Sequence, residues 1–121
     1  MIASTVLLLA AQAASLPPAV ENEIVVLGRR LATWRGRARL RDGVVRCETT
    51  SSSGDARLDA LRCDGMRWCM NESDAAMQAT DGLSRTERRT RIAAVETRLA
   101  ACATDYERRS LEHLARERLA Q

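Results

Sequence analysis

The four cysteines are the feature that most constrains the fold of this 121-residue chain: Cys47, Cys63, Cys69 and Cys102. An even number of cysteines in a short chain is typical of an exported protein with a disulfide framework. The chain has only two Trp, one Tyr and no Phe, so its core buries little area and gains much from cross-links. Zinc is the alternative, but the spacing is not that of a zinc knuckle and the only histidine is distant.

The first residues are typical of a signal peptide covering residues 1–13. An apolar run leads to Ala11-Gln12-Ala13, which fits the small-residue pattern of a cleavage site, although no basic residue precedes the run. The alternative is a buried strand or helix. The run is shorter than the roughly 20 residues of a membrane span, so no transmembrane segment is expected in the mature chain. We therefore expect a periplasmic or secreted protein.

The segment that follows is predicted to be a linker. Residues 14–22 contain the consecutive prolines Pro17 and Pro18, which favour an extended chain. The remaining residues 23–121 are expected to form a single small domain. Within it, residues 23–28 are apolar and β-branched, which predicts a short strand.

Residues 34–50 carry the pattern of a β-hairpin. Arginine alternates with small or apolar residues from Trp34 to Leu40, and Asp42-Gly43 is a strong signal for a two-residue type I′ turn. This turn places Ala38 opposite Cys47 on the core-facing side. The opposite face carries a row of four arginines: Arg35, Arg37, Arg39 and Arg41.

The next segment is predicted to be a helix that begins at Ser53 or Asp55 and ends near Met70. Its period places Leu58, Leu61, Trp68 and Cys69 on one side of the helix, and Cys63 about 120° away from Cys69. The two cysteines therefore have different partners. We predict a Cys47–Cys63 bond between the hairpin and this helix, and a Cys69–Cys102 bond to the C-terminal helix.

The last third of the chain is predicted to be helical. A short helix is expected over residues 73–80, and a second begins at Ser84, which forms a capping box with Glu87. Its apolar stripe changes phase before Leu111 and Leu114. The helix therefore either breaks near Thr104 or continues as a solvated tail. The predicted fold class is α+β, a small antiparallel sheet with a β-hairpin followed by helices and stapled by disulfides.

Charge is concentrated in the hairpin. All 19 Lys and Arg positions are arginine, which is also the composition that a GC-rich genome produces. The placement of the charge is more informative, because residues 29–46 alone carry a net charge of +6. The row of Arg35, Arg37, Arg39 and Arg41 is a candidate anion-binding face. The alternative is a solvated face that protects a strand edge from aggregation. Nucleic acid is not an expected partner, because no aromatic residues interleave with these arginines for stacking.

Catalytic patterns are absent from the sequence. His113 is the only histidine, the serines at 51–53 have no base at a readable spacing, and Asp55 is better explained as a helix cap. There is no phosphate-binding loop, dinucleotide fingerprint or metal-ligand cluster. We expect no enzyme, no cofactor and no metal.

One segment resembles a known family. Residues 42–63 are similar to the strand–loop–helix signature of TonB C-terminal domains through five residues: Ser52, Ser53, Gly54, Leu58 and Asp59. Some members also carry cysteines that match Cys47 and Cys63. The resemblance implies an α+β fold in the periplasm of a Gram-negative bacterium. After Arg67-Trp68 the chain departs from the family, with helices in place of a closing strand.

These observations predict a small exported protein that binds another cell-envelope component, most readily a protein, and catalyses no reaction. One alternative, implied by the resemblance, is a TonB-like module that pairs with an extended receptor segment by strand addition. A second alternative is a basic protein that binds anions or lipids through the arginine row.

Overall fold

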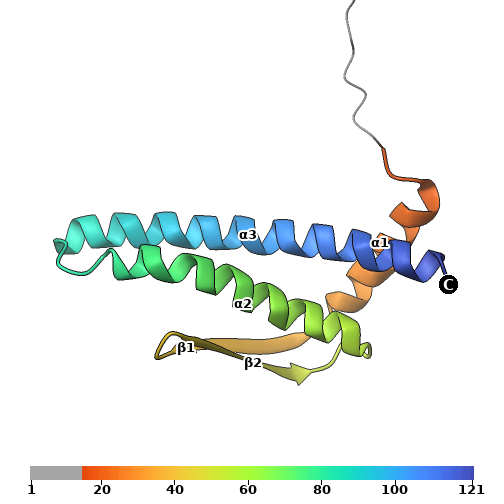
Figure 1. The fold of residues 1–121 in the computed structure, drawn as a ribbon, viewed down its shortest axis with the longest axis horizontal. Helices are drawn as coiled ribbons and strands as arrows, with labels where there is room; N and C mark the ends of the chain where they lie inside the picture. Colours follow the sequence, from red (N-terminus) through yellow and green to blue (C-terminus); the bar gives the residue numbers. More distant parts are fainter. Residues whose placement is uncertain (1–14) are drawn as a thin grey trace, which may run out of the picture.

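The computed structural model describes residues 15–121 and confirms the α+β class. Five elements follow one another: α1 (Pro18–Leu31), β1 (Arg35–Arg41), β2 (Val44–Ser51), α2 (Ala56–Gln78) and α3 (Arg85–Leu119). Helices α2 and α3 form a long antiparallel pair (Figure 1). Helix α1 crosses the C-terminal part of α3, and the two-stranded sheet lies along the first part of α2. The predicted signal peptide lies outside the described residues.

The hairpin has the predicted turn and register. Asp42 and Gly43 both have positive φ angles, 50° and 74°, as a type I′ turn requires. The strands pair antiparallel with Ala38 opposite Cys47 and Arg37 opposite Glu48. The alternation of small and charged residues therefore produces one face directed at α2 and one directed away from it.

The strand predicted over residues 23–28 is wrong, and the linker predicted over residues 14–22 does not extend past Pro17, because Pro18–Leu31 form α1. Proline is tolerated in the first turn of a helix, where its missing N–H has no partner to lose. The buried residues Val20, Leu27 and Leu31 and the partly buried Ile24 recur at helical spacing. Packing of this stripe against α3 outweighs the strand preference of the β-branched residues.

Helix α2 begins at the predicted cap and runs further than predicted. The Asp55 side chain accepts hydrogen bonds from the backbone N–H groups of Arg57 and Leu58. The helix continues to Gln78, so the separate helix predicted over residues 73–80 does not exist. The chain then turns through Gly82, which has a φ of 79°, before Ser84 caps α3.

Helix α3 is continuous past Thr104, and its end is no solvated tail. Leu111, Leu114 and Ala115 are buried in one cluster with Leu27 and Leu31 of α1. The change of phase in the apolar stripe therefore marks a change of partner, from α2 to α1. A break in the helix is unnecessary, because each half of the stripe has its own helix to cover it.

Trp34 occupies the junction between α1, the hairpin and α2. Its indole is buried, and its Nε1 donates a hydrogen bond of 2.9 Å to Thr49 Oγ1 on β2. The ring covers Gly36 so closely that a Cβ atom at this position would lie 2.2 Å from it. Arg62 belongs to α2, and its guanidinium lies 5.9 Å from the centroid of the Trp34 ring. One tryptophan thus connects three elements of the core.

Both predicted disulfides are confirmed. Cys47–Cys63 joins β2 to α2 with an S–S distance of 2.05 Å, and Cys69–Cys102 joins α2 to α3 at 2.08 Å. No cysteine in the described chain is free. The two bonds leave α2 in different directions, as the angular separation of Cys63 and Cys69 requires.

Removal of the second disulfide is expected to destabilise the protein strongly. The Cys69–Cys102 bond closes a loop with a sequence separation of 33, for which chain entropy corresponds to roughly 3–4 kcal/mol. A Cys69→Ala, Cys102→Ala variant should lose about this free energy of unfolding in urea titrations. Non-reducing peptide mapping of the wild type provides the control, and a peptide joining Cys47 to Cys102 would contradict the assignment.

Two helical glycines are expected to respond oppositely to alanine. A Cβ atom on Gly65 of α2 would lie 2.8 Å from Tyr106 Cδ1, whereas one on Gly28 of α1 would meet nothing within 4 Å. Gly28→Ala should therefore raise the free energy of unfolding by about 0.5–1 kcal/mol through helix propensity. Gly65→Ala should lower it by about 1 kcal/mol through overpacking. Urea unfolding of both variants checks this, and equal signs would contradict it.

Candidate binding surface

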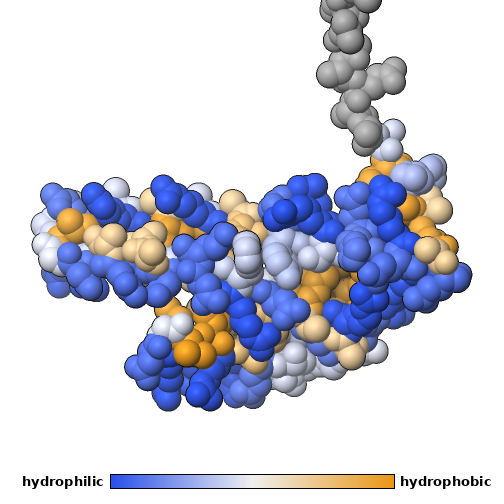
Figure 2. All heavy atoms as spheres, in the orientation of Figure 1, coloured by the Kyte–Doolittle hydropathy of each residue, from blue (hydrophilic) through white to orange (hydrophobic). Residues whose placement is uncertain are grey.

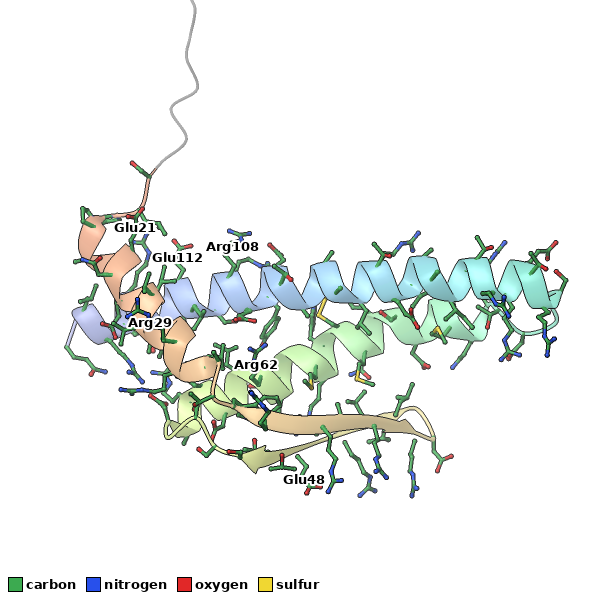
Figure 3. All side chains as sticks on the ribbon, turned by 180° about the vertical axis from the view of Figure 1, so that it is seen from behind. Glu21, Arg29, Glu48, Arg62, Arg108 and Glu112 are labelled. Atoms are coloured by element: carbon green, nitrogen blue, oxygen red, sulfur yellow. A yellow bond between two sulfur atoms is a disulfide. The ribbon has the colours of Figure 1, made fainter. Side chains whose placement is uncertain are left out.

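The outward face of the hairpin carries most of the arginines of β1 and β2. Side chains of directly opposed residues share a face, so Arg39 of β1 lies beside Arg46 of β2, with Arg37 and Arg41 on either side. Figure 3 shows a row of side chains ending in nitrogen that projects from the hairpin away from the helices, near the labelled Glu48. We define the arginine face as Arg37, Arg39, Arg41 and Arg46.

Most of the arginine face has no acidic partner in the described part of the chain. Arg37 forms an exposed ion pair of 3.3 Å with Glu48. Within residues 15–121, Arg39, Arg41 and Arg46 form no ion pair with a carboxylate. Unpaired guanidinium groups present several donors to the solvent and bind carboxylate or phosphate in a bidentate manner. The face is therefore suited to an anionic partner.

The structure changes one member of the predicted row. Arg35 is exposed, but its Nη1 donates hydrogen bonds to the carbonyl oxygens of Ala32 and Trp34 at 3.0 and 2.9 Å. Its guanidinium is thus engaged by the connection between α1 and β1. Arg46 replaces it on the face, and Arg67 of α2 borders the same shallow hollow. Register predicts the position of Arg46, whereas that of Arg67 depends on how α2 packs.

The outer edges of both strands are open. The described chain contains only these two strands, so each strand has a single neighbour. In a hairpin with a two-residue turn, Arg41 and Arg39 direct their backbone groups towards β2. The N–H and C=O groups of Gly36, Ala38 and Leu40 therefore point away from the sheet. This edge of β1 is a surface on which a further strand could pair.

The residues that resemble the TonB signature build the start of α2. The Asp59 carboxylate accepts hydrogen bonds from Ser52 Oγ at 2.5 Å, Ser53 Oγ at 2.7 Å and Ser53 N at 2.9 Å. The bonds from the Ser52 and Ser53 side chains lower the pKa of Asp59. Gly54 has a φ of 85°, and Leu58 is fully buried. These five residues order a loop and a helix start, and none of them is on the arginine face.

Asp55 connects the three helices. Besides capping α2, its carboxylate accepts a hydrogen bond from the Arg118 guanidinium of α3 and lies 3.7 Å from Arg30 of α1. Its side chain is only 12% exposed. The hydrogen bond from Arg118 is the main cause of the lowered pKa of Asp55, which burial opposes and the backbone N–H groups of Arg57 and Leu58 reinforce.

The sole histidine is on the surface of α3. The His113 side chain is 74% exposed, and its Nε2 lies 2.8 Å from Glu117, which also pairs with Arg57.

Among residues 15–121 no cluster of His, Cys, Asp or Glu is arranged to hold a metal ion. No helix in the same part of the chain combines the length and apolarity that a membrane crossing needs.

Trp68 lies on the predicted side of α2, but that side is not fully covered. Its side chain is 54% exposed and lines a groove between α2 and α3 with Leu61 and Tyr106. The period of α2 places Trp68 on the same side as Leu61, which is correct. Whether that side is covered depends on the course of α3, which no local pattern in the sequence reports.

Comparison of the chain with protein-family models, with curated proteins and with solved structures finds no match. The relationship of residues 42–63 to TonB C-terminal domains therefore stays a prediction.

The hydrogen bonds and ion pairs of the Asp55 carboxylate are expected to make the free energy of unfolding depend on pH below about 3.8, the ordinary pKa of aspartate. Because its pKa is lowered in the folded protein, Asp55 stabilises the fold above its unfolded value of about 3.8, and this contribution is lost as the pH falls through the folded value. The substitution Asp55→Asn keeps a capping oxygen but removes the charge. In thermal unfolding, this variant and the wild type should be separated at pH 7, and the separation should shrink as the pH falls below about 3.8. A constant separation would contradict this role.

Proposed function

We propose that this chain is an exported, non-enzymatic binding protein of the bacterial envelope, and that its arginine face binds anionic groups of another envelope component. Three arginines on one face of the hairpin, without acidic partners among residues 15–121, support the anionic ligand most directly. Two disulfides in a small protein fit an oxidising compartment outside the cytoplasm.

The arrangement favours a ligand with several negative charges. Arg39 and Arg46 lie directly opposite each other, so in the free protein they repel and must stay solvated. A phosphate or carboxylate between them removes this repulsion and releases bound counterions. Because the four arginines project from one face of the hairpin, an extended array of charges such as an anionic lipid surface can contact several guanidinium groups together.

A salt titration tests this proposal. Binding to vesicles containing phosphatidylglycerol should weaken steeply from low to physiological salt, where charges more than about 8–10 Å apart are screened. An Arg39→Gln, Arg41→Gln, Arg46→Gln variant should lose binding. The matched control, Arg88→Gln, Arg89→Gln, Arg91→Gln, removes the same charge from α3 and should bind like the wild type.

Two results would contradict the proposal. Equal losses in the hairpin variant and the α3 control would show that only net charge matters. Binding to phosphatidylcholine vesicles as tight as to the anionic ones, without salt dependence, would assign the interaction to apolar contacts.

The open edge of β1 favours a second candidate function, pairing with an extended peptide by strand addition, as the TonB-like resemblance implies. Beside β1, side chains on one face of an added strand would lie next to Arg37, Arg39 and Arg41. Those on the other face would lie towards Leu40 and the apolar patch between the hairpin, the C-terminal part of α2 and the first half of α3 (Figure 2). Acidic and apolar residues in alternation suit this edge, whereas a second copy of β1 would place arginine beside arginine.

A proline substitution separates the two candidates. The N–H of Ala38 points away from β2, so Ala38→Pro is expected to leave the hairpin intact while blocking its edge. It should abolish binding of a peptide alternating glutamate and valine, measured by calorimetry, and leave vesicle binding unchanged. Arg39→Pro is the control that breaks the hairpin itself. Peptide binding that survives Ala38→Pro would exclude strand addition at this edge.

A further inference from the structure

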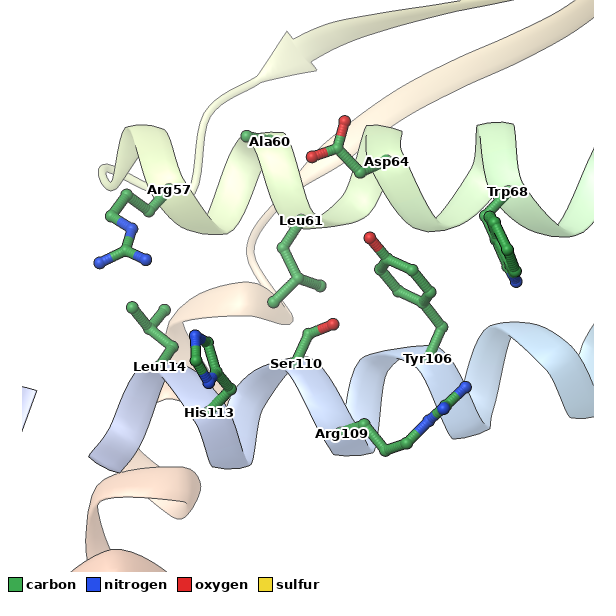
Figure 4. A pocket seen from close by; sticks show the side chains of 10 residues that line it. All are labelled: Arg57, Ala60, Leu61, Asp64, Trp68, Tyr106, Arg109, Ser110, His113 and Leu114. Carbon is green, nitrogen blue, oxygen red and sulfur yellow. The ribbon is translucent and has the colours of Figure 1, made fainter. Parts of the chain in front are cut away.

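A second surface lies between α2 and α3, away from the residues of the arginine face. It is a groove of about 600 Å³, within the roughly 300–1,000 Å³ of small-molecule sites. Leu61 and Leu114 form apolar parts of its lining, and Trp68, Tyr106 and Ser110 supply aromatic and polar groups (Figure 4). No part of the proposed anion binding uses these residues.

Two of the three aromatic residues of the chain meet in this groove. Trp34 is buried in the core, but Trp68 is 54% exposed, which leaves much of a large apolar side chain uncovered. The Tyr106 ring reaches from α3 to α2 and lies against Gly65, where any Cβ atom would meet it at 2.8 Å. Tyr106 is thus held in place by packing, and Trp68 is accessible beside it.

The polar groups of the groove have unused hydrogen-bonding capacity. Three polar groups of the groove form no hydrogen bond to another residue within residues 15–121: Trp68 Nε1, the Tyr106 hydroxyl and the Ser110 hydroxyl. The buried Trp34 Nε1, in contrast, donates to Thr49. An apolar ligand would bury these groups without partners, at a cost in free energy. A ligand with hydroxyl groups at its edges would satisfy them.

The charged groups on the rim already have oppositely charged neighbours. Each pairs with a residue of opposite charge: Arg57 with Glu117 at 2.6 Å, Asp64 with Arg67 at 3.1 Å, and Arg109 with Asp105 at 2.9 Å. Asp105 also pairs with Arg108, and Glu117 also pairs with His113. Because each of these rim charges already has an oppositely charged neighbour, the groove favours a neutral ligand. This distinguishes it from the arginine face, where most of the guanidinium groups have no acidic partner within residues 15–121.

We infer that this groove binds a neutral saccharide. A pyranose ring has an apolar face of C–H groups and a rim of hydroxyl groups, so it combines the two requirements of the site. Its C–H face packs on the exposed indole of Trp68 through weak C–H contacts with the aromatic ring. Its hydroxyls exchange hydrogen bonds with Tyr106 and Ser110, which both donate and accept. An oligosaccharide extends along the groove between the two helices.

Calorimetric titration of the disulfide-bonded protein with chitotetraose and with cellotetraose tests the inference. Saturable binding of at least one of them is expected. Trp68→Ala should weaken it roughly tenfold or more, as truncation of an aromatic anchor does. Tyr106→Phe keeps the ring against Gly65 and removes only the hydroxyl, so it should weaken binding roughly fivefold. Circular dichroism of each variant checks that the fold is retained.

The matched control is the Arg39→Gln, Arg41→Gln, Arg46→Gln variant, which should bind the saccharide like the wild type and so separates this site from the arginine face. Absence of heat and of any change in tryptophan fluorescence with both tetrasaccharides would overturn the inference. Undiminished binding by a folded Trp68→Ala variant would overturn it as well, as would preference for a leucine-rich peptide over both saccharides.

Discussion

The attachment of the hairpin to the helices through one face only is the constraint on which the rest of the structure depends. A two-stranded sheet has no independent stability in water, so it must be held by other elements. The Cys47–Cys63 bond and the Trp34 indole hold its inner face on α2. The outer face and the edge of β1 stay uncovered by residues 15–121 as a result. The surfaces that we propose for binding are therefore a consequence of how the hairpin is anchored.

The α2–α3 pair also needs support outside the main core, because both helices extend beyond the part that packs with α1. Towards their connection few of the described residues are buried, among them Cys69, Val95 and Thr80, and the Cys69–Cys102 bond joins the two helices there. At the other end, Asp55 joins all three helices through its cap and its arginine partners. A covalent bond near the middle of the pair and an ionic network at its base thus replace the large aromatic core that the chain lacks.

The two proposed surfaces differ in how their charges are arranged. Among the described residues Arg39, Arg41 and Arg46 have no acidic partners, so ligand binding there relieves repulsion and responds to salt. In the groove beside Trp68, charged residues are paired with neighbours and the polar groups open to a ligand are neutral donors and acceptors. The two proposed ligands, one anionic and one neutral, therefore do not compete for the same residues.

The sequence by itself determined the features that depend on near neighbours. Alternation over Trp34–Leu40 and the Asp42-Gly43 turn predicted the hairpin and its register, and the side chain of Asp55 marked the start of α2. Because register and helical period set the directions of Cys47, Cys63 and Cys69, both disulfides could also be predicted. Only the tertiary structure decided that residues 18–31 form a helix, that Leu111 and Leu114 pack on it, and that Trp68 stays exposed. These outcomes depend on which element covers which side chain, and burial against a distant segment outweighs the local preferences that a sequence pattern reports.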